Sequence, residues 1–203
     1  MLNRYARAFF ARVLAPAARA LVHAGVSPDA VTILGTLGVV AGALAFYPRG
    51  SFLVGTLVIT AFVFSDMLDG AMARLIGHPS RWGAFLDSTL DRFGDAAIFG
   101  GLVLWFAGRD EIALAAVALY NLAVGAAVPY SKARAESLGF TADVGIAERA
   151  DRLLVILVAT GLHGLGVPYV QEAALWLLAA ASTVTLLQRI LTVRRQALAK
   201  ERA

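Results

Sequence analysis

Six long apolar segments constrain this sequence more than any other feature. They cover approximately residues 30–48, 51–76, 84–107, 111–133, 150–166 and 170–192. A helix needs about 20 mostly apolar residues to cross the hydrocarbon core of a bilayer, and each segment is close to that length. Hydrophobic residues make up 59% of the chain and charged residues only 16%, unlike a soluble globular domain. The pattern predicts an all-α integral membrane protein with six transmembrane helices in a single domain over residues 1–203.

The segment before the first apolar run has a different pattern. Arginines at positions 4, 7, 12 and 19 interrupt it and exclude the apolar core of a cleavable signal peptide. Between them apolar residues recur at roughly helical spacing, for example Tyr5, Phe9 and Val13. A helix that is apolar on one face and basic on the other is typical of the membrane interface. We therefore expect residues 1–24 to form a juxtamembrane amphipathic helix.

The distribution of basic residues predicts the orientation in the membrane. An even number of spans places both termini on one side, and most Lys and Arg residues fall at the termini and connections of that side, whereas the other side offers Arg49 and Arg109. Because basic residues are retained in the cytoplasm, we expect a multi-pass plasma-membrane protein with cytoplasmic termini and a cytoplasmic active site. The net charge of +4 is then explained by contact with anionic lipid, and no nucleic-acid partner is expected.

Four aspartates lie at the cytoplasmic ends of the second and third predicted spans: Asp66, Asp69, Asp87 and Asp91. Spacings of three and four residues place the members of each pair on one helical face. Carboxylates packed this closely repel one another, so a cation is expected among them. The chain has no Cys, and ligation by oxygen alone suits Mg²⁺ or Mn²⁺. The pattern predicts a pair of such ions that activates phosphoryl chemistry, the alternative being a salt-bridge network with Arg74 and Arg92.

The residues around these aspartates resemble the CDP-alcohol phosphotransferases. The stretch from Asp66 to Asp91 fits the pattern D-x2-D-G-x2-A-R-x8-G-x3-D-x3-D of that family at every fixed position. So many fixed residues at fixed offsets inside membrane spans are far more specific than a lone glycine-rich loop. The predicted spans and the amphipathic helix extend the resemblance over nearly the whole chain. It implies a homodimeric enzyme that takes CDP-diacylglycerol as donor and releases CMP without a covalent enzyme intermediate.

The resemblance also implies a role for each matching residue. Asp66, Asp69 and Asp87 would be metal ligands, and Asp91 would be both a ligand and the general base for the incoming hydroxyl. The residues expected to contact the CDP-lipid are Asp29, Thr32, Gly70, Ala73, Arg74 and Gly83. Gly70 and Ala73 would leave room for the cytidine, and Gly83 would allow close packing near the metals, with simple helix packing as the alternative for all three. Arg74 would pair with the diphosphate. Asp29 departs from the asparagine common in the family.

Basic residues at the cytoplasmic ends of the last three predicted spans favour an acceptor that already carries a phosphate. Residues 130–136 are Tyr-Ser-Lys-Ala-Arg-Ala-Glu, and residues 146–152 are Ile-Ala-Glu-Arg-Ala-Asp-Arg. Both stretches resemble the actinobacterial phosphatidylinositol phosphate synthases, which use inositol 1-phosphate. The resemblance implies an acceptor-phosphate site formed by Ser131, Lys132, Arg149, Arg152 and Arg189. The alternative is that these are ordinary basic residues that set the membrane orientation.

Two other functions remain open from the sequence. A phosphatidylglycerol phosphate synthase would also bind a phosphorylated acceptor, glycerol 3-phosphate. A divalent-cation transporter belongs to another class, since acidic residues inside membranes also line ion pathways. Arg74 and the fixed spacing of the motif argue against transport. Metal-dependent release of CMP from CDP-diacylglycerol would separate an enzyme from a transporter.

Overall fold

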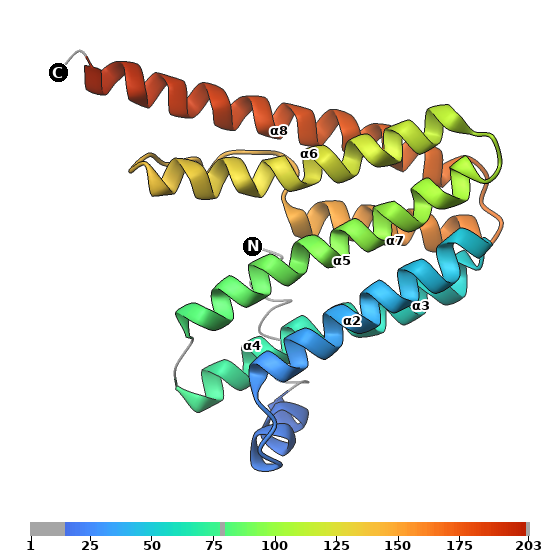
Figure 1. Ribbon diagram of the computed structural model, residues 1–203, viewed down its shortest axis with the longest axis horizontal. Helices are drawn as coiled ribbons and strands as arrows, with labels where there is room; N and C mark the ends of the chain where they lie inside the picture. Colours follow the sequence, from blue (N-terminus) through green and yellow to red (C-terminus); the bar gives the residue numbers. More distant parts are fainter. Residues whose placement is uncertain (1–14, 78–79, 202–203) are drawn as a thin grey trace. The chain divides into compact units, whose positions relative to one another are not determined.

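The structure is a computed structural model that describes residues 15–77 and 80–201, except for the side chain of Asp66 (Figure 1). Helices are the only regular secondary structure in this part of the chain, beginning with residues 15–23. The helices that follow are α2 (Pro28–Phe46), the 3₁₀-helix η1 (Tyr47–Arg49), α3 (Phe52–Val63), α4 (Ser65–Ile76), α5 (Arg81–Ala107), α6 (Ile112–Ser137), α7 (Arg149–Gly164) and α8 (Val170–Glu201). They form two compact units. The first takes the described residues of Met1–Ala45 and Leu57–Ile98, and the second those of Phe46–Thr56 and Phe99–Ala203.

Four helical segments are long and apolar enough to cross a bilayer: Pro28–Arg49, Phe52–Ile76, Ile112–Ser137 and Val170–Glu201. Large apolar side chains on these segments are exposed, among them Leu34, Leu57, Leu119 and Leu187. Extended apolar surface of this kind is unfavourable in water and favourable in hydrocarbon. The chain is therefore an all-helical integral membrane protein.

Helices α5 and α7 coincide with the two remaining predicted spans. α7 has only 16 residues, which is short for a complete crossing. Helix α5 carries five charged residues up to Asp95: Arg81, Asp87, Asp91, Arg92 and Asp95. The described residues thus provide four candidate spans, and the six spans expected from the sequence stay a prediction.

Glycines in α2 allow a close approach to the neighbouring helix of the first unit. A Cβ atom added at Gly38 would lie 2.3 Å from Cδ1 of Phe62, and one added at Gly35 would lie 1.9 Å from Oγ of Ser65. Small residues at such contacts let two backbones come together in a membrane protein. The later glycine contacts the earlier partner and the earlier glycine the later one, so the two chain segments are antiparallel. The residues that precede Gly35 therefore lie beside the residues that follow Ser65. This antiparallel pairing places the start of α2 next to the aspartate-bearing helix α4.

A short interruption at Phe64 separates α3 from α4. The predicted span over residues 51–76 extends across Phe64, so the sequence predicted one uninterrupted helix there. Ser65 Oγ donates a hydrogen bond to the carbonyl of Phe62 at 2.5 Å. Side-chain bonds of this type compete with the main-chain ladder of a helix. The two helices together still form one candidate membrane segment, Phe52–Ile76.

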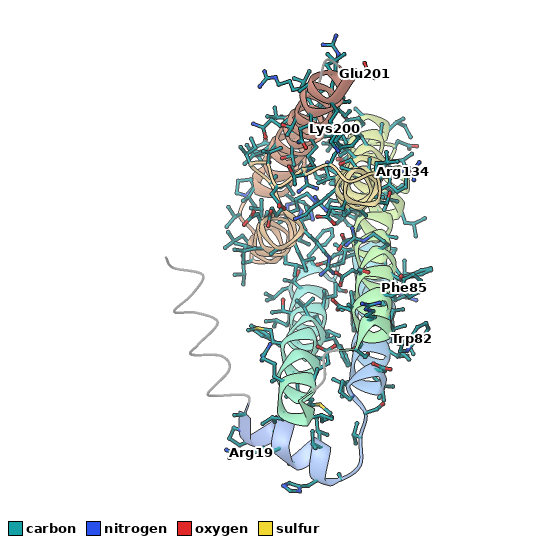
Figure 2. The ribbon with its side chains drawn as sticks, turned by 90° about the vertical axis from the view of Figure 1, so that its left-hand side faces the viewer. Arg19, Trp82, Phe85, Arg134, Lys200 and Glu201 are labelled. Carbon is teal, nitrogen blue, oxygen red and sulfur yellow. The ribbon has the colours of Figure 1, made fainter. Side chains whose placement is uncertain are left out.

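The helix over residues 15–23 packs within the first unit through its apolar face. Ala18 is fully buried in a cluster with Val31, Ala71 and Met72. Arg19, the next residue along, is exposed (Figure 2). The described end of the predicted amphipathic helix therefore has an apolar and a basic side. Residues 1–14 of that predicted helix lie outside the described part of the chain.

In the second unit α8 packs against both α6 and α7 (Figure 1). Buried polar side chains join these helices. Asn121 Nδ2 of α6 donates to the carbonyl of Leu175 in α8 at 2.9 Å, and Gln171 Nε2 donates to Oγ1 of Thr160 in α7 at 3.1 Å. Hydrogen bonds between helices supplement close packing where lipid surrounds the protein. The three helices therefore have defined positions relative to one another within this unit.

The connection between α6 and α7, residues 138–148, is fixed to α8 at two points. Gln196 Oε1 accepts the amide of Thr141 at 3.0 Å, and Gln196 Nε2 donates to the carbonyl of Thr141 at 2.7 Å. Further along, Thr185 Oγ1 accepts the amides of Ile146 and Ala147, both at 3.1 Å. The residues between these two points are thereby held beside α8.

Candidate functional site

The first unit contains a cavity of about 400 Å³ between the start of α2, helix α4 and the start of α5. We call it the acidic cavity. Seven residues predicted from the sequence line it: Asp29, Thr32, Asp69, Gly70, Ala73, Gly83 and Asp87. The antiparallel contact of α2 with α3 and Ser65 explains why two distant stretches of sequence meet here. Sequence reasoning did not select two serines of the lining, Ser27 and Ser80.

Asp69 is the most enclosed carboxylate of the acidic cavity. Its residue is 8% exposed, and Oδ2 accepts a hydrogen bond of 2.5 Å from Oγ1 of Thr32, itself 7% exposed. The Thr32 hydroxyl also lies 3.1 Å from the carbonyl of Pro28. A hydrogen bond to an ionised acceptor is shorter and stronger than a neutral one. Thr32 therefore orients Asp69, a role that the sequence did not indicate.

The backbone at the mouth of the acidic cavity is shaped by small residues. The amide of Gly83 donates to Ser80 Oγ at 2.8 Å at the start of α5. A Cβ atom at Gly83 would lie 3.0 Å from that oxygen and 3.5 Å from Oδ1 of Asp29. By contrast, a Cβ atom at Gly70 would meet only NH1 of Arg74, at 3.6 Å. Gly83 thus permits close packing, whereas Gly70 borders open space.

The structure does not bring all predicted residues to this cavity. Asp91 and Arg74 are absent from its described lining. The Asp91 side chain is 16% exposed, and its Oδ2 lies 3.6 Å from NH2 of Arg92. Arg74 is exposed near the end of α4. The side chain of Asp66 lies outside the described residues, although its backbone belongs to α4.

The donor atoms of the acidic cavity fit a hard divalent cation. Asp29, Asp69 and Asp87 line it, and none of its described lining residues is basic. Carboxylate and hydroxyl oxygens are the ligands that Mg²⁺ and Mn²⁺ prefer. No group of three or more described His, Asp or Glu side chains is close enough to enclose an ion as it stands. The predicted ligand set therefore remains a prediction, supported by the chemistry of the lining.

The second unit contains a cavity of about 270 Å³ with the opposite character, which we call the basic pocket. Four of the five predicted acceptor-binding residues line it: Lys132, Arg149, Arg152 and Arg189. They come from α6, α7 and α8. The fifth, Ser131, is not in the lining, and its hydroxyl donates to the carbonyl of Val128 at 2.7 Å. The structure thus gathers the predicted cations around one cavity.

Backbone carbonyls hold the two buried arginines of the basic pocket. Arg152 is 3% exposed, and its NH2 donates to the carbonyl of Gly125 at 3.1 Å. Arg189 is 4% exposed and donates to the carbonyls of Val128, at 2.6 Å, and Val144, at 3.0 Å. A buried charge is costly unless such bonds compensate it. The carbonyls therefore fix the positions of both guanidinium groups.

Lys132 has a different partner, which the sequence analysis missed. Its ammonium forms an ion pair with Asp143, a residue of the connection between α6 and α7, and lies 4.0 Å from Oε1 of Glu136. The hydrogen bond and charge of Lys132 lower the pKa of the Asp143 carboxyl, with Arg189 contributing in the same direction. Asp143 is therefore a carboxylate at neutral pH. No sequence pattern marked it, because it belongs to no motif and contacts Lys132 across a loop.

The sequence profile of the CDP-alcohol phosphatidyltransferase family matches residues 25–135, more than half of the chain. The chain belongs to this family. The matched region contains the aspartate motif, the residues that line the acidic cavity, and Lys132. It ends before the three arginines of the basic pocket. The family resemblance seen in the sequence is thus confirmed for this phosphatidyltransferase.

Relatives of this phosphatidyltransferase cover the remaining residues as well. A phosphatidylinositol phosphate synthase from Streptomyces avermitilis is 60% identical over 204 aligned residues, which span 97% of this chain and 84% of that protein. A protein of the same name from Cutibacterium acnes is 50% identical, over 96% of this chain and 98% of its own length. The chain is thus similar over most of its length to proteins that share the name phosphatidylinositol phosphate synthase.

Solved structures of a Mycobacterium tuberculosis phosphatidylinositol phosphate synthase resemble this phosphatidyltransferase. The structure with CDP-DAG bound matches with a TM-score of 0.86 at 44% identity, covering 90% of this chain and 94% of that one. The structure in complex with manganese and citrate matches with a TM-score of 0.85 at 44% identity, covering 89% and 88%. The two chains therefore share their fold.

Proposed function

We propose that this phosphatidyltransferase transfers the phosphatidyl group of CDP-diacylglycerol to inositol 1-phosphate, giving phosphatidylinositol phosphate and CMP. The observation that carries the proposal is the presence of two polar cavities of opposite charge, the acidic cavity and the basic pocket. The first suits a metal-bound diphosphate and the second a free phosphate group. The relatives at 60% and 50% identity, both named phosphatidylinositol phosphate synthase, support the same acceptor.

In the proposed reaction an acceptor hydroxyl attacks the phosphorus that carries the lipid, and the bond from that phosphorus to the CMP oxygen breaks. Asp91 takes the hydroxyl proton, and because the acceptor itself attacks the phosphorus, no covalent enzyme intermediate forms. Two bound Mg²⁺ or Mn²⁺ ions, held by Asp66, Asp69, Asp87 and Asp91, would neutralise the diphosphate and stabilise the leaving group. The manganese complex of the mycobacterial relative supports a divalent cation. Thr32 keeps the Asp69 carboxylate oriented for this task.

The basic pocket is proposed to hold the phosphate of the acceptor. A guanidinium presents several donors in a fixed fork that matches phosphate oxygens, and Lys132 adds a point charge. Arg152 and Arg189 are already held by carbonyls, so little conformational freedom is lost when they bind. A neutral alcohol such as free inositol would form no charge-assisted hydrogen bond through a phosphate to these cations. The arrangement therefore favours a phosphorylated acceptor.

The membrane arrangement proposed for the enzyme follows the sequence prediction. Six spans would include α5 and α7 beside the four candidate segments, with residues 1–24 at the interface and both termini in the cytoplasm. The exposed Arg19 beside the buried Ala18 supports an interfacial position for the described end of that helix. Cytoplasmic access would supply water-soluble inositol 1-phosphate to the basic pocket. We also propose a homodimer in the plasma membrane, on the resemblance to the family.

The decisive experiment is an acceptor panel with the purified enzyme in detergent. CDP-diacylglycerol is offered with inositol 1-phosphate, free inositol or glycerol 3-phosphate, at several Mn²⁺ and Mg²⁺ concentrations. Release of CMP and the mass of the lipid product are measured. We expect rapid, metal-dependent CMP release with inositol 1-phosphate and little with free inositol.

The outcomes of the panel separate the alternatives. Preference for glycerol 3-phosphate would identify a phosphatidylglycerol phosphate synthase, which the basic pocket also suits. Efficient use of free inositol would contradict a phosphate site. If no acceptor gave metal-dependent CMP release although the protein carried Mn²⁺ across vesicle membranes, the acidic residues would belong to a transport pathway.

A further inference from the structure

Among the cations of the basic pocket, Lys132 has a contact that opposes anion binding. Its ammonium is ion-paired with the exposed carboxylate of Asp143, whereas Arg152 and Arg189 each donate to a neutral backbone carbonyl. An anion that enters the pocket must compete with the Asp143 carboxylate for Lys132. It meets no such competition from a carbonyl, which carries no charge to be displaced.

The position of Asp143 is built into the fold. The connection that carries it is tied to α8 before it, through Thr141 and Gln196, and after it, where Arg189 donates to the carbonyl of Val144 at 3.0 Å. The backbone therefore keeps Asp143 beside Lys132. Its side chain is 72% exposed, so the carboxylate can turn into water without losing buried contacts. A fixed backbone and a solvent-exposed carboxylate suit an ion pair that forms and breaks reversibly.

We propose that Asp143 is an internal competitor for the acceptor phosphate, and that it sets the affinity of the basic pocket by occupying Lys132 until a phosphate takes its place. This inference rests on the proposed function, in which the pocket receives the acceptor. In the empty pocket Asp143 relieves repulsion between Lys132 and the neighbouring arginines. On binding, the lysine exchanges one anionic partner for another, and Asp143 is released to solvent.

The expected size of the effect is small, because an exposed ion pair changes an equilibrium by no more than about fivefold. Asp143→Asn removes the charge and keeps the shape of the side chain. We expect it to lower both the KM for inositol 1-phosphate and the inhibition constant of inorganic phosphate, by about two- to fivefold. The KM for CDP-diacylglycerol should stay unchanged.

Two further variants test whether the effect acts through Lys132. Asp110→Asn removes an equal charge from an exposed position on the connection between α5 and α6, and it should leave phosphate inhibition as in the parent. In a Lys132→Met background, Asp143→Asn should no longer tighten phosphate binding, because the competition has lost its target. An equal effect of Asp110→Asn, or a full effect of Asp143→Asn without Lys132, would overturn the proposal.

A direct binding measurement separates this inference from the proposed function. Binding of inorganic phosphate is measured by calorimetry on the detergent-solubilised protein, without CDP-diacylglycerol. If the parent makes no phosphatidylinositol phosphate but Asp143→Asn still tightens phosphate binding, the proposed acceptor is wrong and the competition stands. If the parent is active but the variant binds phosphate with unchanged or weaker affinity, the competition is refuted. Weaker binding would instead make Asp143 a contact of the ligand.

Discussion

Replacing Thr32 with valine tests whether the acidic cavity holds the metal. The change removes the hydroxyl that donates to Asp69 at 2.5 Å. Thr32 and Asp69 are 7% and 8% exposed, so water cannot easily replace the lost donor. A hydrogen bond to a charged group contributes about 1.5–3 kcal/mol, which corresponds to a change of about tenfold to more than a hundredfold. Loss of a partner that orients a metal ligand costs about 10–100-fold in metal affinity, in agreement with that range.

We expect the Mn²⁺ concentration that gives half-maximal CMP release to rise about 10–100-fold in Thr32→Val. At saturating Mn²⁺, kcat should return to within a few-fold of the parent, because Asp69 is still present. Thr32→Ser keeps the hydroxyl and should restore most of the metal affinity. Thr36→Val, one turn further along α2, removes a hydroxyl outside the acidic cavity and should have little effect.

The reasoning is refuted if Thr32→Val has the same Mn²⁺ dependence as the parent. It is also refuted if Thr32→Ser is as impaired as Thr32→Val, since a loss of side-chain volume or helix packing would then explain both results. An equal loss in Thr36→Val would point to a general weakening of α2. Thermal unfolding of all variants in the presence of excess EDTA checks that the metal-free protein remains folded.

Three further predictions address the base, the acceptor and the packing. Asp91→Asn should abolish transfer while binding of CDP-diacylglycerol is largely kept; near-normal turnover would exclude Asp91 as the base. Arg152→Ala should raise the KM for inositol 1-phosphate about tenfold or more, with the KM for CDP-diacylglycerol steady in the same initial-rate assay. Gly164→Ala would place a Cβ atom 2.4 Å from the backbone nitrogen of Leu53 and should lower the free energy of unfolding by about 1–3 kcal/mol. Gly100→Ala, where that atom meets nothing within 4 Å, should not destabilise, as thermal unfolding would show.

The sequence predicted the helices well because long apolar runs leave a chain in lipid few alternatives. Helices of the second unit agree with the predicted spans, although α8 continues to Glu201, well past the apolar segment. Hydropathy did not predict the interruption at Phe64, because Phe52–Ile76 taken as a whole is still long and apolar enough to cross a membrane. What separates α3 from α4 is a local contact of Ser65 with the backbone, which an apolar pattern does not record.

The candidate site could be predicted to the extent that it depends on motifs. The spacing of the aspartates predicted that they face one spot, and Asp69 and Asp87 line one cavity; Lys132 and Arg152, from the basic stretches, line another. The pairing of Lys132 with Asp143 could not be predicted. It depends on the path of a loop, which is set by tertiary hydrogen bonds to α8 and not by periodicity.

Pro129 explains why α6 offers a backbone carbonyl to a buried arginine of the basic pocket. Proline has no amide proton, so the carbonyl four residues earlier, that of Gly125, lacks its usual helical donor. Arg152 of α7 donates to this carbonyl at 3.1 Å. The bond offsets part of the cost of burying the guanidinium. It also supplies a donor to the carbonyl that the proline leaves without its helical partner. Arg152 thus donates to a neutral carbonyl, whereas Lys132 is ion-paired with Asp143. The basic pocket therefore combines two arginines held by backbone carbonyls with one lysine that is ion-paired with Asp143.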